Sequence, residues 1–567
     1  MVQHTPEFLR QRSSNLSLRM AAPAASTAAS RFSSFANPAK FEAKPTVSEA
    51  EKAFIVGELE KQQGLMLCDA CYRDVPDTRT DSLRFQLANT RASCSACSIM
   101  TSKPEAFTEP FCAFLRENPT VFHAVNYFKT KMASLGFKEL PPREDWSGKI
   151  EPGGKYFVTR NGSSTIGFTV GKAYKPGNGV AMIAGHIDAL TARLKPVSNK
   201  STTAGYVQLG IAQYAGALNE TWWDRDLSIG GRVIVRDGSG KTTSKLVKLD
   251  WPIARIPTLA PHFGVGMMGQ NNKETQAVPI IGLESSTSGN SKPTEPLGPV
   301  GSFVATQPPR LVQLISKELG IKDYSQIVNW ELELFDLQPA TVGGMDKEFI
   351  FAGRIDDKLC SWAAFHGLLA SEQKEDDGTI KLVALFDDEE IGSLLRQGAK
   401  GNFLPSVIER TVESMCGNEK AFGPGVIGQT YANSFLVSAD VTHAINPNFL
   451  SRYQEDHAPR LNVGITICAD SNGHMTTDSV STAVLTRVCE LSDCTPQVFQ
   501  IRNDSRSGGT VGPSLSSALG VRAADAGMAQ LSMHSIRATC GSLDPGLGVK
   551  FFKGFLDNWE RVDSEWQ

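Results

Sequence analysis

The 567-residue sequence contains no apolar run long enough to span a bilayer, and it has no overall excess of basic residues, since its formal net charge is −3. A membrane-spanning helix needs about 20 consecutive apolar residues. Proteins that bind nucleic acids through the phosphates usually carry a marked positive charge. We therefore expect neither a membrane nor a nucleic acid as a partner. No internal repeat is visible either.

The eleven cysteines do not form the pattern of a disulfide framework. Several of them, including Cys360, Cys468 and Cys540, lie inside apolar stretches or beside candidate catalytic residues. Such positions favour free thiols in a reducing compartment. The location expected from this pattern is the cytoplasm.

Acidic residues are nearly absent from residues 1–41, where Glu7 is the only one among many Ser, Ala and Arg. Such a composition cannot bury a core, and we expect residues 1–52 to be disordered. It also fits an organelle transit peptide, so organelle targeting is the alternative to a cytoplasmic tail. No continuous apolar segment of the kind found in secretory signals appears.

Residues 53–102 form a cysteine-rich extension with two C-x-x-C pairs. Cys68, Cys71, Cys94 and Cys97 could supply four thiolates to a structural Zn²⁺, because such sites are tetrahedral and sulfur-rich. The 22 residues between the pairs slightly exceed the usual spacing. Four unligated thiols are the alternative.

The stretch from Lys381 to Ser393 carries the strongest chemical signal. Its apolar run, Leu382 to Phe386, predicts a buried strand of a parallel sheet. Four carboxylates, Asp387 to Glu390, follow at once. Adjacent like charges at the end of a core strand repel and lose water, and a cation would offset that cost. A solvated acidic turn is the alternative when this stretch is taken alone.

Three further apolar runs end in side chains that can bind a metal. They are residues 181–188 with His186 and Asp188, residues 351–357 with Asp356 and Asp357, and residues 435–440 with Asp440. His534 supplies a second imidazole late in the chain. Ligand sites of α/β sheets lie at the carboxyl ends of the strands. Two His and several carboxylates suit a pair of Zn²⁺ ions that share one bridging carboxylate.

Six motifs occur in a fixed order: AGHIDA, GRIDDKLC, LFDDEEIGS, SADVTHAINPNF, RNDSRSGGTVGP and MHSIRATCG. Together they resemble the M18 family of metallo-aminopeptidases over roughly residues 104–555, and they are most similar to its members selective for N-terminal Asp or Glu. The resemblance implies two Zn²⁺ per subunit and peptide substrates with a free N-terminus. It also implies a homo-oligomer, a dodecamer.

The expected fold is α/β, a mostly parallel sheet flanked by helices of the zinc aminopeptidase type, with an inserted β-rich assembly domain. Residues 103–188 and 344–567 would form the catalytic domain. Residues 189–343, which lie between the first and second metal motifs, would form the insert. In the family, the insert mediates assembly, and His262 matches a histidine that reaches the active site of a neighbouring subunit.

The resemblance also assigns the metal ligands. His186 and Asp440 would hold one Zn²⁺, Glu390 and His534 would hold the other, and Asp356 would bridge the two.

The reaction itself is assigned to two further residues. Glu389 would be the general base, which takes a proton from a metal-bound water as that water attacks the peptide carbonyl. Asp188 points to the same strand face as His186, so it would orient the imidazole.

One position departs from the family pattern. Acid-selective members place a lysine downstream of the SAD motif, and Cys468 stands at about that position here. A thiol cannot supply that charge, so Arg460 is the expected replacement. Three alternatives stay open: an aminopeptidase of broader or neutral specificity, another hydrolase with the same metal core, and a non-catalytic assembly or binding protein with a relic site.

Overall fold

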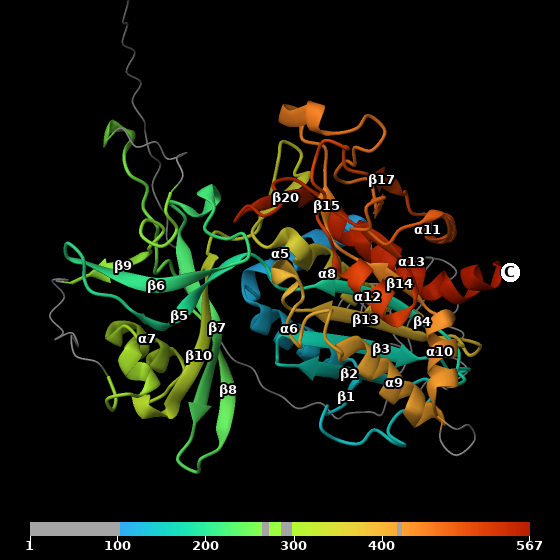
Figure 1. Ribbon diagram of the computed structural model, residues 1–567, viewed down its shortest axis with the longest axis horizontal. Coiled ribbons are helices and arrows are strands. Elements are labelled where there is room, and N and C mark those ends of the chain that lie inside the picture. The colour runs from blue at the N-terminus through green and yellow to red at the C-terminus, as the bar shows by residue number, and fades with distance from the viewer. Residues whose placement is uncertain (1–102, 264–270, 285–296, 417–421, 567) are drawn as a thin grey trace, which may run out of the picture.

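Two large β-sheets organise the part of the chain that this computed structural model describes, residues 103–263, 271–284, 297–416 and 422–566 (Figure 1). A nine-stranded sheet forms the centre of one lobe, and a six-stranded sheet forms the centre of a second lobe. The predicted N-terminal extension, including the four cysteines of its two C-x-x-C pairs, lies outside the described residues.

The nine-stranded sheet is parallel at its centre and mixed at its edges. Its strands lie in the order β1 (Lys138–Glu139), β2 (Lys155–Arg160), β3 (Ser164–Val170), β13 (Ile380–Phe386), β4 (Val180–His186), β14 (Phe435–Ser438), β18 (Arg522–Gly527), β16 (Thr466–Cys468) and β17 (Gln497–Phe499). The central strands β13, β4, β14 and β18 run parallel to one another. Every residue of β13, β4 and β14 is buried, because helices cover both faces.

Helices pack on both faces of this sheet, and the strand residues alternate between two cores. One core combines Ile183 and Val383 with α5 (Thr108–Glu117), α6 (Val121–Ser134), α8 (Ile355–Ala370), α11 (Ser479–Ser492) and α13 (Asp544–Ser564). The other combines Met182 and Leu382 with α9 (Phe403–Cys416), α10 (Pro424–Ala432) and α12 (Val511–Leu519). The alternation follows from the two-residue period of a strand. The predicted α/β fold with helices flanking the sheet is confirmed.

A hairpin joins β2 to β3, which pair antiparallel. Of the three residues between the strands, Asn161 and Gly162 have φ angles of 57° and 67°. Two successive positive φ values match the right-handed twist of the strands, which is why Asn-Gly is favoured at such turns.

The six-stranded sheet is antiparallel and belongs to residues 191–336. Its strands lie in the order β8 (Thr242–Lys248), β7 (Leu227–Arg236), β10 (Ile327–Asp336), β5 (Thr191–Asn199), β6 (Tyr206–Tyr214) and β9 (Ile280–Leu283). With α7 (Pro309–Glu318) it encloses a core of its own, which includes Trp222 and Trp330. We call this lobe the insert, because it falls within the predicted excursion at 189–343.

Two small sheets hold the connections near the carboxyl edge of the nine-stranded sheet. Strand β11 (Thr341–Gly343) pairs with β12 (Phe349–Ala352), which pairs with β20 (Ala538–Gly541), and β15 (Thr442–His443) pairs with β19 (Ala529–Gln530). The loop that carries His534 runs between β19 and β20. Among the described helices, none combines the length and apolar character needed to cross a membrane.

Candidate metal centre and substrate cavity

The candidate ligands gather because parallel strands end at one edge of the sheet. His186 is the last residue of β4 and lies opposite Phe386, the last residue of β13. The acidic residues 387–390 therefore begin beside that histidine. Asp440 follows β14, which pairs with β4 on its other side. The neighbouring strands thus deliver ligands to one place, as the sequence predicted from the strand ends.

Asp356, in the first turn of α8, lies between the two imidazoles. One carboxylate oxygen, Oδ1, is 3.2 Å from His186 Nε2, and the other, Oδ2, is 3.5 Å from His534 Nε2. Asp440 Oδ1 is 3.6 Å from His186 Nε2, and Glu390 Oε2 is 3.7 Å from His534 Nε2. The cluster therefore divides into two halves that share the carboxylate of Asp356.

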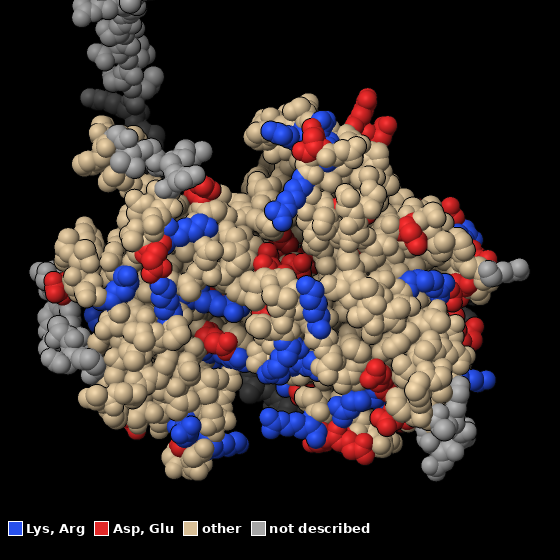
Figure 2. Space-filling model, viewed as in Figure 1, with Lys and Arg blue, Asp and Glu red and all other residues tan. Residues whose placement is uncertain are grey.

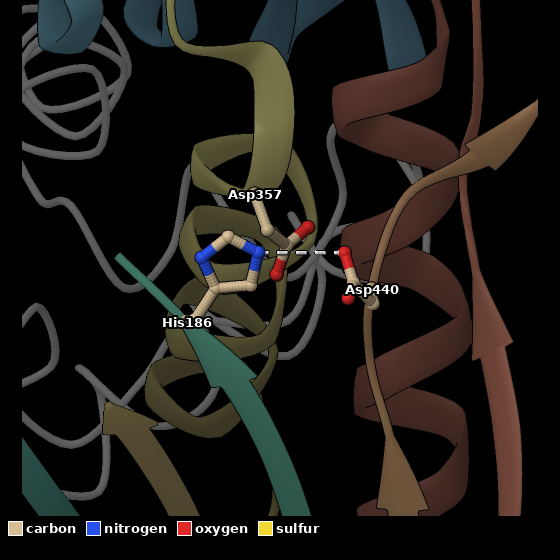
Figure 3. A group of neighbouring side chains, drawn as sticks. All are labelled: His186, Asp357 and Asp440. Atoms are coloured by element: carbon tan, nitrogen blue, oxygen red, sulfur yellow. Dashed lines mark ion pairs between the residues drawn. The ribbon is translucent and has the colours of Figure 1, made fainter. Parts of the chain in front are cut away.

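Asp357 is a fully buried carboxylate that is not among the five ligands assigned by the family resemblance. Its side chain lies between those of His186 and Asp440 (Figure 3). Its oxygens accept hydrogen bonds from the backbone N–H of Cys360, at 3.3 Å, and from Ser361 Oγ, at 3.4 Å. Two groups of possible ligands result: His186 with Asp357 and Asp440, and Asp356 with Glu390 and His534. Because both donors belong to α8, Asp357 also ties the start of that helix to the cluster.

Asp188 organises the other side of His186. Its Oδ1 lies 3.2 Å from His186 Nδ1, so the imidazole presents Nε2 to the cluster. It also accepts the backbone N–H groups of Glu389, at 3.2 Å, and Glu390, at 3.1 Å. One buried carboxylate therefore orients both an imidazole and the turn η6 (Glu389–Ile391). Asp388, just before that turn, adopts φ 66°, which turns the chain sharply after the strand.

The protein groups alone leave these carboxylates poorly stabilised as anions. Burial, and then the charge of Asp440, raises the pKa of Glu389 to about 8, against the lowering effect of His186. Burial and the charge of Asp356 raise the pKa of Glu390 well above its ordinary value. Glu390 Oε1 is also buried without a hydrogen-bond partner among the described groups. A dication would satisfy that oxygen and reverse these shifts, so the donor set fits metal ions.

A positive charge near Asp387 and Asp388, the two acids before Glu389, was not predicted from the sequence. Burial and the charge of Asp188 raise the pKa of Asp387 well above its ordinary value and also raise that of Asp388. Arg193 of the insert opposes both shifts. Because Arg193 is remote in sequence and carries no motif, only the folded arrangement identifies it.

A cavity of about 100 Å³ opens beside the candidate ligands Asp356, Asp440 and His534. The rest of its lining consists of Glu389, Val441, Thr442, His443, Ala469, Asp470, Met475, Phe499, Ile501, Ser507, Gly508, Gly509, Thr510 and Met533. No described lysine or arginine lines it. Its acid outside the metal cluster is Asp470, whose side chain is only 4% exposed. Figure 2 shows carboxylates gathered in a recess between the two lobes.

Two residues predicted to bind substrate lie elsewhere. Arg460 is exposed and is not among the residues that line the cavity; its backbone N–H donates to Gln497 Oε1. His262 is exposed on η3 (Pro261–Phe263) of the insert and lines no cavity at the cluster of its own chain. Cys468 is buried at the end of β16, next to Ala469 and Asp470 of the cavity wall.

Comparison with known proteins gives a consistent result. Residues 114–556 match the family model described as aminopeptidase I zinc metalloprotease (M18). Vacuolar aminopeptidase 1 of Saccharomyces cerevisiae is 43% identical over 82% of this chain and 91% of its own length. Aspartyl aminopeptidase of Aspergillus oryzae is 40% identical over 80% of this chain and 96% of its own.

Solved structures agree with the sequence relatives. The structure of Chaetomium thermophilum mApe1 is 65% identical, with a TM-score of 0.77, and covers 82% of this chain and 100% of its own. The mApe1 dodecamer of S. cerevisiae is 39% identical, with a TM-score of 0.71, and covers 82% of this chain and 99% of its own.

Proposed function

The chain belongs to the M18 family of zinc metallo-aminopeptidases, and from this premise we propose that it uses two Zn²⁺ ions to release single residues from the free N-terminus of a peptide. The observation that carries the proposal is the carboxylate of Asp356, with one oxygen toward each imidazole. A carboxylate in that position suits two ions that lie close together. A carboxypeptidase, a deacylase and a relic site become weaker alternatives for a member of this family.

In this proposal, His186 and Asp440 hold one ion, Glu390 and His534 hold the other, and Asp356 serves both. When bound, the ions supply Lewis-acid polarisation of the substrate carbonyl and lower the pKa of water.

Glu389 is the proposed general base. Its Oε2 lies 3.8 Å from His186 Nε2, and it lines the substrate cavity. It takes a proton from the attacking water and returns one to the leaving amine. Asp188 keeps the proton of His186 on Nδ1, so that Nε2 faces the ligand cluster as an acceptor.

The cavity wall favours neutral, apolar first residues over acidic ones. Met475, Phe499 and Ile501 offer apolar surface, whereas Asp470 supplies a negative charge. Although burial raises the pKa of Asp470, hydrogen bonds from Ser507 and the N–H of Asn472 lower it below its ordinary value overall. An acidic substrate side chain would meet that charge with no lysine or arginine beside it among the described residues of the wall, which is unfavourable in a partly dry cavity.

Preference for N-terminal Asp or Glu remains a second candidate, because several relatives are named aspartyl aminopeptidases. The two candidates differ in one measurable ratio. A panel of peptides with free N-termini and varied first residues, assayed on zinc-loaded protein, should give a higher kcat/KM for Leu or Met than for Asp or Glu. A higher value for Asp or Glu would establish the second candidate, and cleavage of N-terminally blocked peptides would overturn the aminopeptidase mechanism.

We also propose that the active protein is a dodecamer in which His262 serves a neighbouring subunit. Support comes from the S. cerevisiae mApe1 structure, which is described as a dodecamer, and from the exposure of His262 away from its own cavity. Light scattering should give about twelve times the 61.3 kDa chain mass.

A mixing experiment tests the shared site. His262→Ala and Glu389→Gln should each be inactive alone, and assemblies formed from both should recover activity, since some sites then combine two intact residues. An active monomer, or no recovery in mixed assemblies, would contradict the shared site.

A reducing compartment, such as the cytoplasm, is our proposed location, because none of the seven cysteines in the described residues forms a disulfide. A fluorescent fusion of the full chain, compared with one lacking residues 1–52, separates this location from organelle targeting. Redistribution of the shortened fusion would establish a targeting role for that segment.

A further inference from the structure

The insert contacts the catalytic centre of its own subunit through Tyr214. This residue ends β6, and its hydroxyl donates a hydrogen bond of 2.7 Å to Asp188 Oδ2. The other groups bonded to that carboxylate, which are His186 and the N–H groups of Glu389 and Glu390, belong to the catalytic domain. Tyr214 is therefore the residue through which the insert hydrogen-bonds to Asp188, the carboxylate that orients His186.

The phenol ring of Tyr214 is held from the opposite side by the insert's own sheet. The guanidinium of Arg193 lies 4.0 Å from the ring centroid, a distance typical of a cation–π contact. Arg193 on β5 stands opposite Glu333 on β10, and their side chains pair at 3.8 Å. Neighbouring strands thus fix the direction in which the hydroxyl points.

The hydroxyl acts as a donor to the carboxylate and keeps its proton. Burial, followed by the charges of Asp188 and Asp387, raises the pKa of Tyr214 well above its ordinary value. Asp188 is almost fully buried, so water cannot readily replace a lost donor. A buried carboxylate that loses a hydrogen bond is less well fixed and less stable as an anion.

We propose that Tyr214 is a positioning residue of the aminopeptidase reaction, which holds Asp188 in place and thereby orients His186 and the turn that bears Glu389 and Glu390. The insert then has a role in the chemistry of its own subunit in addition to assembly. The inference rests on the proposed function only in that His186 is taken to be a zinc ligand.

The test compares Tyr214→Phe with Tyr206→Phe, a partly exposed tyrosine at the other end of the same strand. Zinc affinity is measured on the full-length assembly by competition with a chromophoric chelator, and activity is measured with zinc in excess. Tyr214→Phe should weaken one of the two zinc sites and lower kcat, each by about 10-fold, with KM nearly unchanged. Tyr206→Phe should match the unmodified protein in every measurement, and both variants should keep its oligomeric mass.

A second pair of variants shows whether the effect passes through Asp188. In an Asp188→Asn background, Tyr214→Phe should change zinc affinity and kcat by less than twofold, because the group it positions is already altered. The inference is overturned if Tyr214→Phe alone leaves both zinc affinities and kcat within twofold, or if its full effect persists in the Asp188→Asn background. Failure of the proposed function would look different, since the unmodified protein would not bind two zinc ions or would not release N-terminal residues.

Discussion

The candidate metal cluster and the candidate substrate cavity share Asp356, Glu389, Asp440 and His534, yet they are built differently. Four of the five proposed ligands stand at or just after the end of a strand, and His534 stands in the loop between β19 and β20. The cavity wall comes from separate loops between residues 441 and 510, joined to the loop of His534. The proposed metal cluster depends on ionised groups, whereas the wall is largely apolar and has one acid outside that cluster, Asp470, whose side chain is 4% exposed.

This difference separates what carries the chemistry from what selects the substrate. Ligands at strand ends are fixed by the sheet, so their substitution should abolish turnover with all substrates. Wall residues would contact the substrate side chain and not the reacting groups, so their substitution should change the ratio between substrates. The first four predictions below test that division, in order of decreasing effect on activity.

The largest effect is expected from Asp356→Asn. Removal of the shared carboxylate charge should reduce zinc content below one equivalent and lower kcat/KM by about 10⁴-fold or more, because each ion contributes several kcal/mol. Asp357→Asn is the matched control and should retain two zinc equivalents, since its oxygens bond to Cys360 and Ser361. Elemental analysis after gel filtration decides the outcome. Two zinc equivalents in Asp356→Asn would refute the proposal that Asp356 binds both ions. If zinc is lost only in Asp357→Asn, Asp357 is the residue that binds both ions.

Glu389→Gln should keep both zinc ions and lower kcat by about 10²–10⁴-fold, the range expected when a general base is removed. The loss should be equal for all first residues of the substrate. Glu390→Gln is the control and should lose one zinc equivalent. If Glu389→Gln loses zinc and Glu390→Gln keeps it, the two neighbouring residues have exchanged roles.

Asp470→Asn should leave zinc content unchanged and raise the ratio of kcat/KM for Asp peptides to that for Leu peptides by about 10-fold, or about 1.4 kcal/mol. Loss of like-charge repulsion is the reason. The exposed Asp504, paired with Arg502 at 2.8 Å, supplies the control variant Asp504→Asn, which should not change the ratio. An equal change for Asp and Leu peptides would mean that Asp470 acts on the fold of the wall.

Arg460→Ala provides a second test of the wall. The motif alignment predicts that this substitution lowers kcat/KM for acidic peptides by about 10–100-fold. The exposed position of Arg460 outside the cavity predicts a change of less than twofold for every substrate. Selective loss of acidic substrates would favour the sequence prediction and would require Arg460 to act across a subunit boundary.

The last prediction concerns the stability of the fold, not activity, and it involves a histidine outside both regions. Burial, and then the charge of Lys131, lowers the pKa of His366 to about 3, and its ring packs on Trp362 at 4.1 Å. Because the unfolded chain binds a proton below pH 6.5 and the folded chain does not, His366 should make the protein less stable as the pH falls from 6.5 toward 3. The loss should reach about 2 kcal/mol at pH 5. Denaturant unfolding at pH 5 and 7.5 should show a smaller pH difference for His366→Phe, with activity at pH 7.5 retained. An unchanged pH difference would rule out this contribution.

The apolar runs predicted the parallel core and the gathering of acids and His186 at its carboxyl edge, whereas the resemblance to the M18 family assigned the five proposed ligands. His534 lies in a loop between β19 and β20 and follows no such run. It did not predict Tyr214 or Arg193, which come from strands whose pattern only indicates burial; their contacts depend on how the two sheets meet. It also did not identify Asp470 as a wall residue, although this acid lies two positions after Cys468. The direction of a loop side chain depends on tertiary packing. Motif matching could therefore suggest Arg460 as the cation that replaces the family lysine, but it could not show whether Arg460 points into the cavity.

Diffraction from crystals of the zinc-loaded full-length protein, recorded on both sides of the zinc absorption edge, tests the central claim most directly. We expect two anomalous peaks per subunit, one between His186 and Asp440 and one between Glu390 and His534, with an oxygen of Asp356 on each. A single peak, or a second peak not coordinated by Asp356, would contradict the two-zinc centre.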